Sequence, residues 1–327
     1  MKTIETTFAG LKLKNPIIVS SSSLTNSAEK NQKLCEAGAA AVVLKSLMEE
    51  QIHLDVEGME DNDPFVVGGN DLTAYMLEYK MDEYFTMIRD TKRVVDIPVI
   101  ASINAYDESN WVSFAKKIED AGADAIEINI LALQTSLDYQ YGAFEQKHIN
   151  ILKLVKNVVN IPIIMKLGDN FTNPVALIHQ LRAHGAAGVV LFNRFYPTDI
   201  NIDKVEQCAG KPFTTEDDLS KALRWTGIAS AAVSNYSFAI SGGVHNAAGV
   251  VKSILAGASA VEVCSAIYQR GNAVIKEMTD GLTEWMNTHT MDDIAMFRGM
   301  LNQQYRNEGI NTFERTQFMK YYGRFKK

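Results

Sequence analysis

The chain has 327 residues, a length that suits either two ordinary domains or one large α/β barrel. Hydrophobic residues make up 46% of it and charged residues 22%, which is typical of a folded globular protein and excludes disordered, collagen-like and disulfide-stapled classes. With 32 basic against 39 acidic residues, the net charge is −7, so no overall positive field attracts nucleic acid or an anionic membrane.

The three cysteines, Cys35, Cys208 and Cys264, are far apart and form no CxxC pair. This pattern favours a reducing compartment and argues against a zinc site or an iron–sulfur cluster. The N-terminus lacks the apolar segment of a secretory signal, and no apolar run approaches the roughly 18 residues of a membrane span. We therefore expect a cytoplasmic protein without a membrane partner, a nucleic-acid partner or a metal site.

Two kinds of apolar segment alternate along the chain. The segments of the first kind are NPIIVSS (15–21), IPVIASI (97–103), IPIIMKL (161–167) and SFAISGG (237–243). Proline is the second residue of the first three, and the fourth has no proline. Those of the second kind follow a glycine at the end of a helical pattern: CEAGAAAVVLKS (35–46), EDAGADAIEINI (119–130), RAHGAAGVVLFN (182–193) and ILAGASAVEVCS (254–265). The continuous apolar runs are typical of buried parallel strands, so the pattern predicts eight of them.

Helical patterns separate most of these strands. The candidates are 27–37, 108–121, 145–159, 173–184 and 246–256. Eight parallel strands with crossover helices close into a (β/α)8 TIM barrel, and a doubly wound sheet is the alternative. We expect the whole chain, residues 1–327, to form this single domain.

Four further segments lie outside the regular repeat. Residues 3–15 predict an N-terminal β-hairpin that turns near Ala9-Gly10 and closes the bottom of the barrel. Long inserts at 47–97 and 194–236 follow strands two and six, which places them on the catalytic face. The end of the chain predicts two helices over 270–323 outside the barrel, with 288–327 as a C-terminal helical tail.

Polar residues stand at the ends of the predicted strands. They are Ser20, Ser21, Lys45, Ser46, Ser102, Asn104, Asn129, Lys166, Asn193, Ser241, Cys264 and Ser265. The carboxyl ends of barrel strands converge, so these side chains predict one site. Two lysines that end buried strands are costly unless they meet an anion or a polar ligand.

A phosphate site is predicted at strands seven and eight. Strand seven ends in SGGVHNAAG (241–249), where Gly242 and Gly243 precede a helix, and strand eight ends at Cys264 and Ser265. Bare backbone N–H groups at a helix N-terminus favour an anion, and barrels of this kind often bind phosphate there. The residues alone therefore predict a phosphorylated ligand or cofactor.

The ordered motifs resemble the soluble, FMN-dependent class of dihydroorotate dehydrogenases, over nearly the whole chain to about residue 275. They are NPIIVSSSS (15–23), LKS (44–46), EIN (127–129), MKL (165–167), FN (192–193), SGGV (241–244) and CSA (264–266). The resemblance implies an FMN-dependent dehydrogenase that acts on CH–CH groups. It would oxidise dihydroorotate to orotate in pyrimidine biosynthesis, or a related substrate, by hydride transfer to flavin N5.

The resemblance also implies residue roles. At the flavin ring of FMN, Ser20 and Ser21 would contact the flavin, Lys45 and Ser46 would lie along the ring, and Gly227 would lie beneath it. Asn129 would lie between flavin and substrate, and Lys166 would lie at the N1/C2 carbonyl end of the ring. The phosphate would be held by Gly242, Gly243, Cys264 and Ser265. The positive charge of Lys166 would stabilise reduced flavin and raise its reduction potential. Lys45, Asn129 and Asn193 are the implied catalytic set, and Asn193 would also bind substrate.

The chain departs from the family pattern around the substrate. The family's catalytic cysteine corresponds to Ala132, which cannot accept a proton, and a family asparagine corresponds to Gln134. Asn70 is a partial match to the family's substrate loop, and Arg194 is suited to pair with a substrate carboxylate. The candidate replacement bases are Ser136, Asp138, Tyr139 and Tyr141.

Several alternatives stay open from the residues alone. They are a flavin-free lyase or isomerase with Lys45 or Lys166 as its reactive lysine, a non-catalytic FMN-binding protein, and a tRNA-reducing flavin barrel, which the acidic charge opposes. We expect a small-molecule substrate such as a dihydropyrimidine and a homodimer. Transfer of electrons to NAD through an iron–sulfur centre would require a partner subunit to supply that centre.

Overall fold

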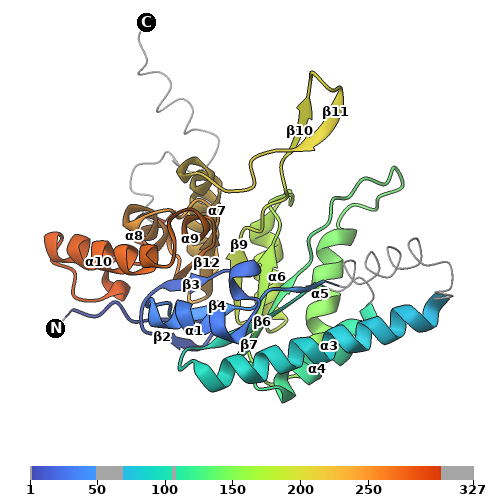
Figure 1. Ribbon diagram of the computed structural model, residues 1–327. Helices are drawn as coiled ribbons and strands as arrows, with labels where there is room; N and C mark the ends of the chain where they lie inside the picture. Colours follow the sequence, from blue (N-terminus) through green and yellow to red (C-terminus); the bar gives the residue numbers. More distant parts are fainter. Residues whose placement is uncertain (1, 49–68, 105–107, 303–327) are drawn as a thin grey trace, which may run out of the picture.

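The centre of the protein is a closed barrel of eight parallel strands, seen in a computed structural model that describes residues 2–48, 69–104 and 108–302 (Figure 1). The strands are β3 (Ile17–Val19), β4 (Ala41–Val43), β6 (Val99–Asn104), β7 (Ala125–Asn129), β8 (Ile163–Leu167), β9 (Gly188–Leu191), β12 (Ser237–Ser241) and β13 (Ala260–Val263). Neighbours pair in chain order, β13 pairs with β3, and β4 pairs with β6, so the ring has no free edge. The predicted (β/α)8 barrel is confirmed, and the open doubly wound sheet is excluded.

The five helices predicted between strands are present with nearly the expected bounds. They are α1 (Ala28–Glu36), α4 (Glu108–Asp120), α5 (Ala143–Lys156), α6 (Pro174–Ala183) and α8 (Ala247–Ala256). Side-chain caps start several of them, as Ser27 does for α1. Gly257 ends α8 at φ 118°, a conformation that other residues rarely adopt.

The two long connections each contain a crossover helix that the sequence analysis missed. The first holds the short strand β5 (Leu47–Met48) and then α3 (Gly69–Val94), while its residues 49–68 lie outside the described part. The second holds the antiparallel hairpin β10 (Thr198–Asn201) and β11 (Glu206–Ala209), the 3-10 turn η2 (Glu216–Asp218) and α7 (Leu219–Ala232). The β10–β11 hairpin projects away from the barrel in Figure 1, and its side chains are largely exposed.

The N-terminal hairpin closes the lower end of the barrel. Strands β1 (Thr6–Phe8) and β2 (Leu11–Leu13) pair across Ala9 and Gly10, as the sequence predicts. Phe8 and Leu13 are buried in one cluster with inward residues of the barrel strands. Burial of these apolar side chains seals the barrel interior from water at this end.

Inside the barrel, side chains form layers because alternate residues of each strand point inward. One layer is apolar and includes Ile18, Ala125, Ile164 and Ala260. Two positions further along the same strands stand Ser20, Glu127, Lys166 and Glu262, none of them more than 5% exposed. Strand geometry therefore places three charged side chains in the barrel interior, directly above the apolar layer.

The C-terminal part differs from its prediction. A short helix, α9 (Ser265–Arg270), follows β13, and α10 (Ala273–Thr288) packs against α8 and α9. After α10 the described chain contains only the 3-10 turn η3 (Ile294–Met296), so a helical tail from 288 is wrong as far as residue 302, and 303–327 lie outside the described residues. Within the described chain no helix has the length and apolar character to cross a membrane.

Candidate active site

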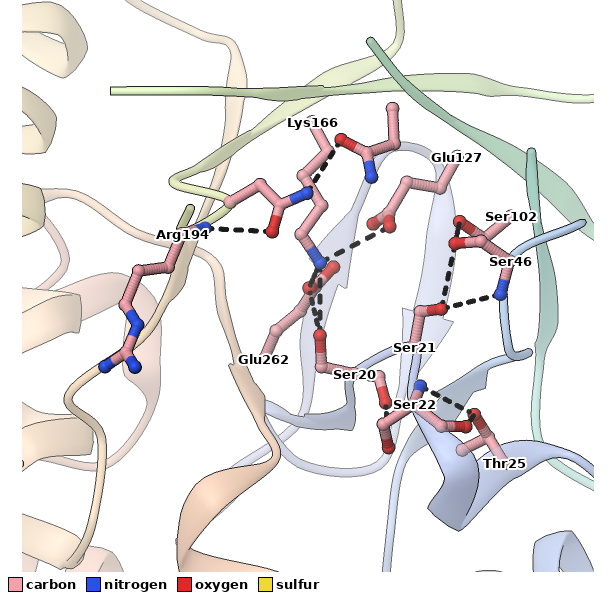
Figure 2. A network of polar contacts seen from close by, with 12 residues as sticks. Ser20, Ser21, Ser22, Thr25, Ser46, Ser102, Glu127, Lys166, Arg194 and Glu262 are labelled. Atoms are coloured by element: carbon pink, nitrogen blue, oxygen red, sulfur yellow. Dashed lines mark hydrogen bonds and ion pairs between the residues drawn. The ribbon is translucent and has the colours of Figure 1, made fainter. Parts of the chain in front are cut away.

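Three buried charges meet at the centre of the barrel's catalytic face. The Lys166 ammonium donates to Glu262 Oε2 at 2.6 Å and to Ser20 Oγ at 3.1 Å, and it lies 3.4 Å from Glu127 Oε1 (Figure 2). Ser20 in turn donates to Glu262 Oε2 at 2.9 Å. These residues come from the ends of β3, β7, β8 and β13, so closure of the barrel brings them together. We call Glu127, Lys166 and Glu262 the buried trio.

The two carboxyl groups of the trio differ in their environments. Burial raises the pKa of Glu127 well above its ordinary value, and the charge of Glu262 raises it further. Burial also disfavours ionised Glu262, but the Lys166 charge and hydrogen bonds from Glu127, Lys166 and Ser20 outweigh it and lower its pKa. Burial likewise disfavours charged Lys166, yet the charges of Glu127 and Glu262 raise its pKa overall. Lys166 is therefore a paired ammonium ion.

A separate chain of hydroxyl groups lies across neighbouring strand ends. Ser21 Oγ lies 3.0 Å from Ser46 Oγ, which lies 2.7 Å from Ser102 Oγ (Figure 2). The Tyr84 hydroxyl of α3 donates to Ser102 O at 2.9 Å and accepts from Ser102 N at 2.8 Å. Burial raises the pKa of Tyr84, so this hydroxyl stays neutral. The network fixes Ser21 and Ser46 beside the site.

Lys45 lies at the point where the chain leaves the ladder between β4 and β6. Leu44 N still donates to Ile100 O at 2.9 Å, but Lys45 N donates to Thr25 O at 3.3 Å, and pairing with β6 resumes at β5. Tyr84 fills the gap in hydrogen bonding at Ser102. The Lys45 side chain is exposed, and it does not line the central cavity. The expected place of Lys45 along a flavin ring stays a prediction.

A cavity of about 180 Å³ opens above the trio. Its lining includes most of the predicted cofactor residues, which are Ser20, Ser21, Lys166, Gly242, Gly243, Cys264 and Ser265, and the predicted substrate residue Asn193. Glu262, Phe192, Thr214 and Tyr196 complete it together with neighbouring residues. Burial raises the pKa of the Cys264 thiol, which opposes a role for it as a thiolate. The cavity joins the charged floor to the predicted phosphate end.

The two glycines of the phosphate end serve different purposes. At Gly242, φ is +91° and an added Cβ would meet only Thr214 Cγ2, at 3.9 Å, so this position leaves room at the cavity. At Gly243, φ is +77° and an added Cβ would lie 2.2 Å from Leu219 N at the start of α7. Gly243 is thus required for packing against α7, whereas Gly242 leaves space for a ligand.

Segment 210–215 of the second insert reaches the phosphate end through Thr214. Thr214 N donates to Ser265 Oγ at 3.1 Å, and Thr214 Oγ1 lies 3.0 Å from His245 Nε2. The Ser265 hydroxyl accepts this bond and keeps its own proton to donate. Ser265 also begins α9, where backbone N–H groups face outward from the helix start.

Asn129 and Asn193 form a direct pair at the ends of β7 and β9. Asn193 Nδ2 donates to Asn129 Oδ1 at 2.9 Å, and Asn193 Oδ1 accepts from Arg194 N at 2.8 Å. Asn129 is 6% exposed. Within the described residues Asn129 Nδ2 makes no hydrogen bond, and Asn129 lies outside the lining of the central cavity.

The Arg194 guanidinium is engaged elsewhere. It donates to the backbone carbonyls of Lys211 and Pro212 at 2.7 and 3.1 Å, and Figure 2 shows it turned away from Lys166. These bonds join the two ends of the β10–β11 insert. Arg194 therefore positions the insert while it also lines the central cavity, and its predicted pairing with a substrate carboxylate stays a prediction.

Gly227 is absent from the cavity lining. It lies in the middle of α7, where it is buried. Its predicted place beneath a flavin ring stays a prediction. Asn70 lies in the first turn of α3, and its side chain falls outside the described part.

The loop between β7 and α5 carries the remaining substrate-side candidates. Ala132, Gln134, Ser136, Asp138 and Tyr141 are all exposed. Ser136 Oγ accepts from Asp138 N at 3.2 Å. No side chain from this loop lines the central cavity. It projects from the barrel in Figure 1.

Tyr139, the remaining candidate base of this loop, has a structural contact instead. Its hydroxyl accepts a hydrogen bond from Phe144 N, at 3.3 Å, in the first turn of α5. The side chain is only half-buried, and its ring packs edge to face against Tyr141. Tyr139 therefore supports the start of α5 and does not reach the trio.

Four residues of the hydrogen-bond and charge network at the site were not singled out by the sequence analysis, and Glu127 was noted only within the EIN motif. They are Glu127, Glu262, Tyr84 and Thr214. A signal for the two glutamates was present, because each interrupts an otherwise apolar strand, in AIEIN and AVEV. An acid at an inward position of a buried strand requires a partner. Tyr84 and Thr214 carry no such signal, since their roles depend on contacts between distant segments. Among the described residues no group of three or more His, Cys, Asp or Glu side chains is arranged to hold a metal ion.

Comparisons with known proteins agree with this geometry. The catalytic subunit of dihydroorotate dehydrogenase B (NAD(+)) from Thermoplasma volcanium is 27% identical over 318 residues, which cover 92% of this chain and 99% of that protein. The NAD-dependent dihydropyrimidine dehydrogenase subunit PreA of Escherichia coli is 24% identical over 320 residues, 92% of this chain and 77% of that protein.

A solved structure and a family model extend the likeness. Dihydroorotate dehydrogenase of Eimeria tenella, solved with ferulenol, shares the fold with a TM-score of 0.65 at 14% identity, over 91% of this chain and 88% of that one. The family model for dihydroorotate dehydrogenase matches residues 3–286, from the N-terminal hairpin to the end of α10. The chain belongs to the dihydroorotate dehydrogenase family.

Proposed function

We propose that the protein is an FMN-dependent oxidoreductase that oxidises a dihydropyrimidine, dihydroorotate first among them, or a related CH–CH substrate. The observation that carries the proposal is the continuous cavity from the Ser265 and Gly242 end to the Lys166 floor. Its donors suit the two ends of a phosphorylated aromatic cofactor, with a helix N-terminus and a hydroxyl at one end and an ammonium at the other. Relatives named as dehydrogenases support the same reaction class.

In this proposal each part of the cavity has one task. Gly242, Cys264 and Ser265 would hold the phosphate of FMN, while Ser20, Ser21 and Lys166 would lie at its ring. FMN supplies a hydride acceptor when it is bound. Asn129 and Asn193, fixed against each other, would orient a substrate carbonyl or carboxylate through the amide N–H groups of Asn129.

Ala132 cannot act as a base, and no side chain of the exposed 131–142 loop reaches the cavity. A general base contributes about 10²–10⁴ in rate. We therefore expect slow reduction by dihydroorotate compared with an enzyme that carries a cysteine at position 132. The same observation favours one second candidate, a protein that binds FMN without oxidising a dihydropyrimidine.

The state of Lys166 opposes the lyase alternative. A Schiff-base lysine must lose its proton to become a nucleophile, whereas Lys166 is a buried ammonium whose pKa is raised by two carboxyl groups. Its donors point to Glu262, Ser20 and Glu127. A flavin-free reaction at this lysine is therefore disfavoured.

Transfer of electrons to NAD through an iron–sulfur centre would require a partner subunit. Two relatives are named as a catalytic subunit and as a subunit of NAD-dependent enzymes. We propose that a second protein subunit receives the electrons here too, and that the chain forms a homodimer in the cytoplasm and serves pyrimidine metabolism.

The test begins with FMN binding to the purified apoprotein, followed by flavin fluorescence. Riboflavin, which lacks the phosphate, should bind more weakly than FMN. Gly242→Leu should weaken FMN binding at least tenfold. The matched control is Gly271→Leu, which places a side chain at another positive-φ glycine with open space around it, outside the cavity.

Anaerobic titration with dihydroorotate then follows the flavin absorbance. Slow bleaching supports the proposed dehydrogenase. Flavin that binds and bleaches with dithionite but never with dihydroorotate or dihydropyrimidines supports the non-catalytic candidate. Failure of the unaltered protein to bind FMN would refute the proposal.

A further inference from the structure

The buried trio holds two acids and only one base, and each of the three side chains is almost fully buried. Glu127 is 1% exposed, Glu262 is 2% exposed and Lys166 is 5% exposed. One ammonium balances one carboxylate. A second buried carboxylate without its own counter-charge carries a large desolvation cost, so it keeps a proton instead.

Geometry decides which acid keeps the proton. Glu262 Oε2 accepts from Lys166 at 2.6 Å and from Ser20 at 2.9 Å, so its ionised form is well supported. Neither oxygen of Glu127 accepts a hydrogen bond, and its Lys166 contact is longer, at 3.4 Å. A protonated Glu127 resolves this deficit because its hydroxyl can donate to Glu262.

We propose that the buried trio is a charge-neutral unit in which Glu127 stores a proton and Glu127 and Glu262 can exchange the role of counter-ion to Lys166. The floor of the cavity therefore carries no net positive charge. Loss of either glutamate leaves the unit neutral, because the remaining carboxyl group ionises and pairs with Lys166. Only loss of both exposes the charge of the lysine.

The groups around Glu127 do not provide another counter-charge. Lys166 on β8 and Glu262 on β13 face it, and Tyr84 on α3 is the nearest further titratable side chain, held neutral by burial. Cys264 lies on the Lys166 side of the trio, where burial raises its thiol pKa. Lys166 is thus the one positive charge that the described part of the chain brings to this pair of acids.

The first test needs no cofactor. Infrared spectra of the apoprotein at pH 7 should show the carbonyl band of one protonated carboxylic acid, and Glu127→Gln should remove it. Glu262→Gln should remove it too, because Glu127 then ionises beside Lys166. The control is Glu36→Gln, on the exposed side of α1, which should leave the band unchanged.

Each outcome of this test decides the proposal. A band that persists in Glu262→Gln shows that Glu127 does not take over as counter-ion, which overturns the exchange. If the unaltered protein shows no carbonyl band that Glu127→Gln removes, Glu127 does not hold a proton and the proposal is overturned. If Glu262→Gln does not fold, Lys166→Gln takes its place: both acids should then be protonated and the band should double, whereas an unchanged band overturns the proposal.

A second test rests on the proposed function, because it uses bound FMN as the probe. Each single variant, Glu127→Gln or Glu262→Gln, should change the equilibrium constant for flavin reduction by less than about threefold. The double variant should raise it at least about tenfold, which corresponds to about 30 mV for a two-electron couple. An equal rise of this equilibrium constant in Glu262→Gln alone would overturn the proposal that the two glutamates share the role of counter-ion to Lys166. Failure to bind FMN would refute the proposed function and leave the infrared result standing.

Discussion

The floor of the cavity and the 131–142 loop contrast in how firmly the structure defines them. The floor is buried, each of its charges has a partner, and its residues come from four strands. The loop is exposed, and its contacts are mostly local, such as Ser136 with Asp138 and Tyr139 with Phe144. Under the proposed function, the barrel interior would determine the cofactor chemistry, whereas the substrate chemistry would depend on a segment that the barrel does not constrain.

The largest expected effect comes from supplying the loop with a base. Under the proposed function, with the 131–142 loop closed over bound substrate, Ala132→Cys should raise the rate of FMN reduction by dihydroorotate by about 10²–10⁴, because a thiolate there could then take the substrate proton. Stopped-flow absorbance measures the rate. The control is Leu133→Cys, one residue on, which should have no effect. An unchanged rate in Ala132→Cys would show that the loop differs from that of dihydroorotate dehydrogenases in position as well as in sequence.

Removal of the central charge tests the floor itself. Lys166→Met should cost about 3–5 kcal/mol of unfolding free energy at pH 7, because it leaves two buried acids without a cation. Urea unfolding measures this cost. Lys33→Met removes a surface partner of Glu29 and should be without measurable effect. A similar small effect at Lys166 would mean that the trio is not buried in solution.

The two glycines of the phosphate end give a matched pair. Gly243→Ala should lower the free energy of unfolding by about 2–5 kcal/mol. The added Cβ would meet the backbone of Leu219, and alanine would also be strained at this positive φ. Gly242→Ala carries the strain alone and should cost about 1–2 kcal/mol. Denaturant unfolding of both variants checks the order, and a reversed order would contradict the contact with α7.

The stored proton predicts a pH dependence with a definite sign. The pKa of Glu127 is raised on folding, so between its ordinary value and its raised one the folded state binds the extra proton. The contribution of Glu127 to the free energy of unfolding is therefore present at low pH and is lost as the pH rises through that window. The free energy of unfolding falls by up to about 1.4 kcal/mol for each pH unit. Glu127→Gln should remove this slope. Glu5→Gln, at an exposed position, should keep it, and equal slopes in all three proteins would contradict the prediction.

The smallest effects are expected in the loop. Asp138→Ala and Tyr141→Phe should each change stability by less than about 0.5 kcal/mol, because both side chains are exposed. Neither should alter the rate of FMN reduction by dihydroorotate. A tenfold or greater fall in that rate for one variant would identify its residue as the base and would show that the loop closes over the cavity.

Much of the fold was predictable because it depends on local pattern. Alternating segment types indicated eight strands, and the apolar hairpin around Ala9 and Gly10 was located at the correct turn. Helices α3 and α7 were missed because they lie within long connections that were interpreted as inserts. The candidate site was predicted where residues end strands, as for Ser20, Lys166 and Ser265, since strand ends converge in any barrel.

The sequence by itself determined the barrel, the family and the strand-end residues, because strand period and motif order are properties of the chain. Only the tertiary structure decided which side chains meet. It paired Lys166 with Glu262 and Glu127, turned Arg194 to the base of its insert and left Lys45 exposed beside a broken strand. These outcomes depend on distances between strands far apart in the chain, and burial and charge compensation act only once those distances are set.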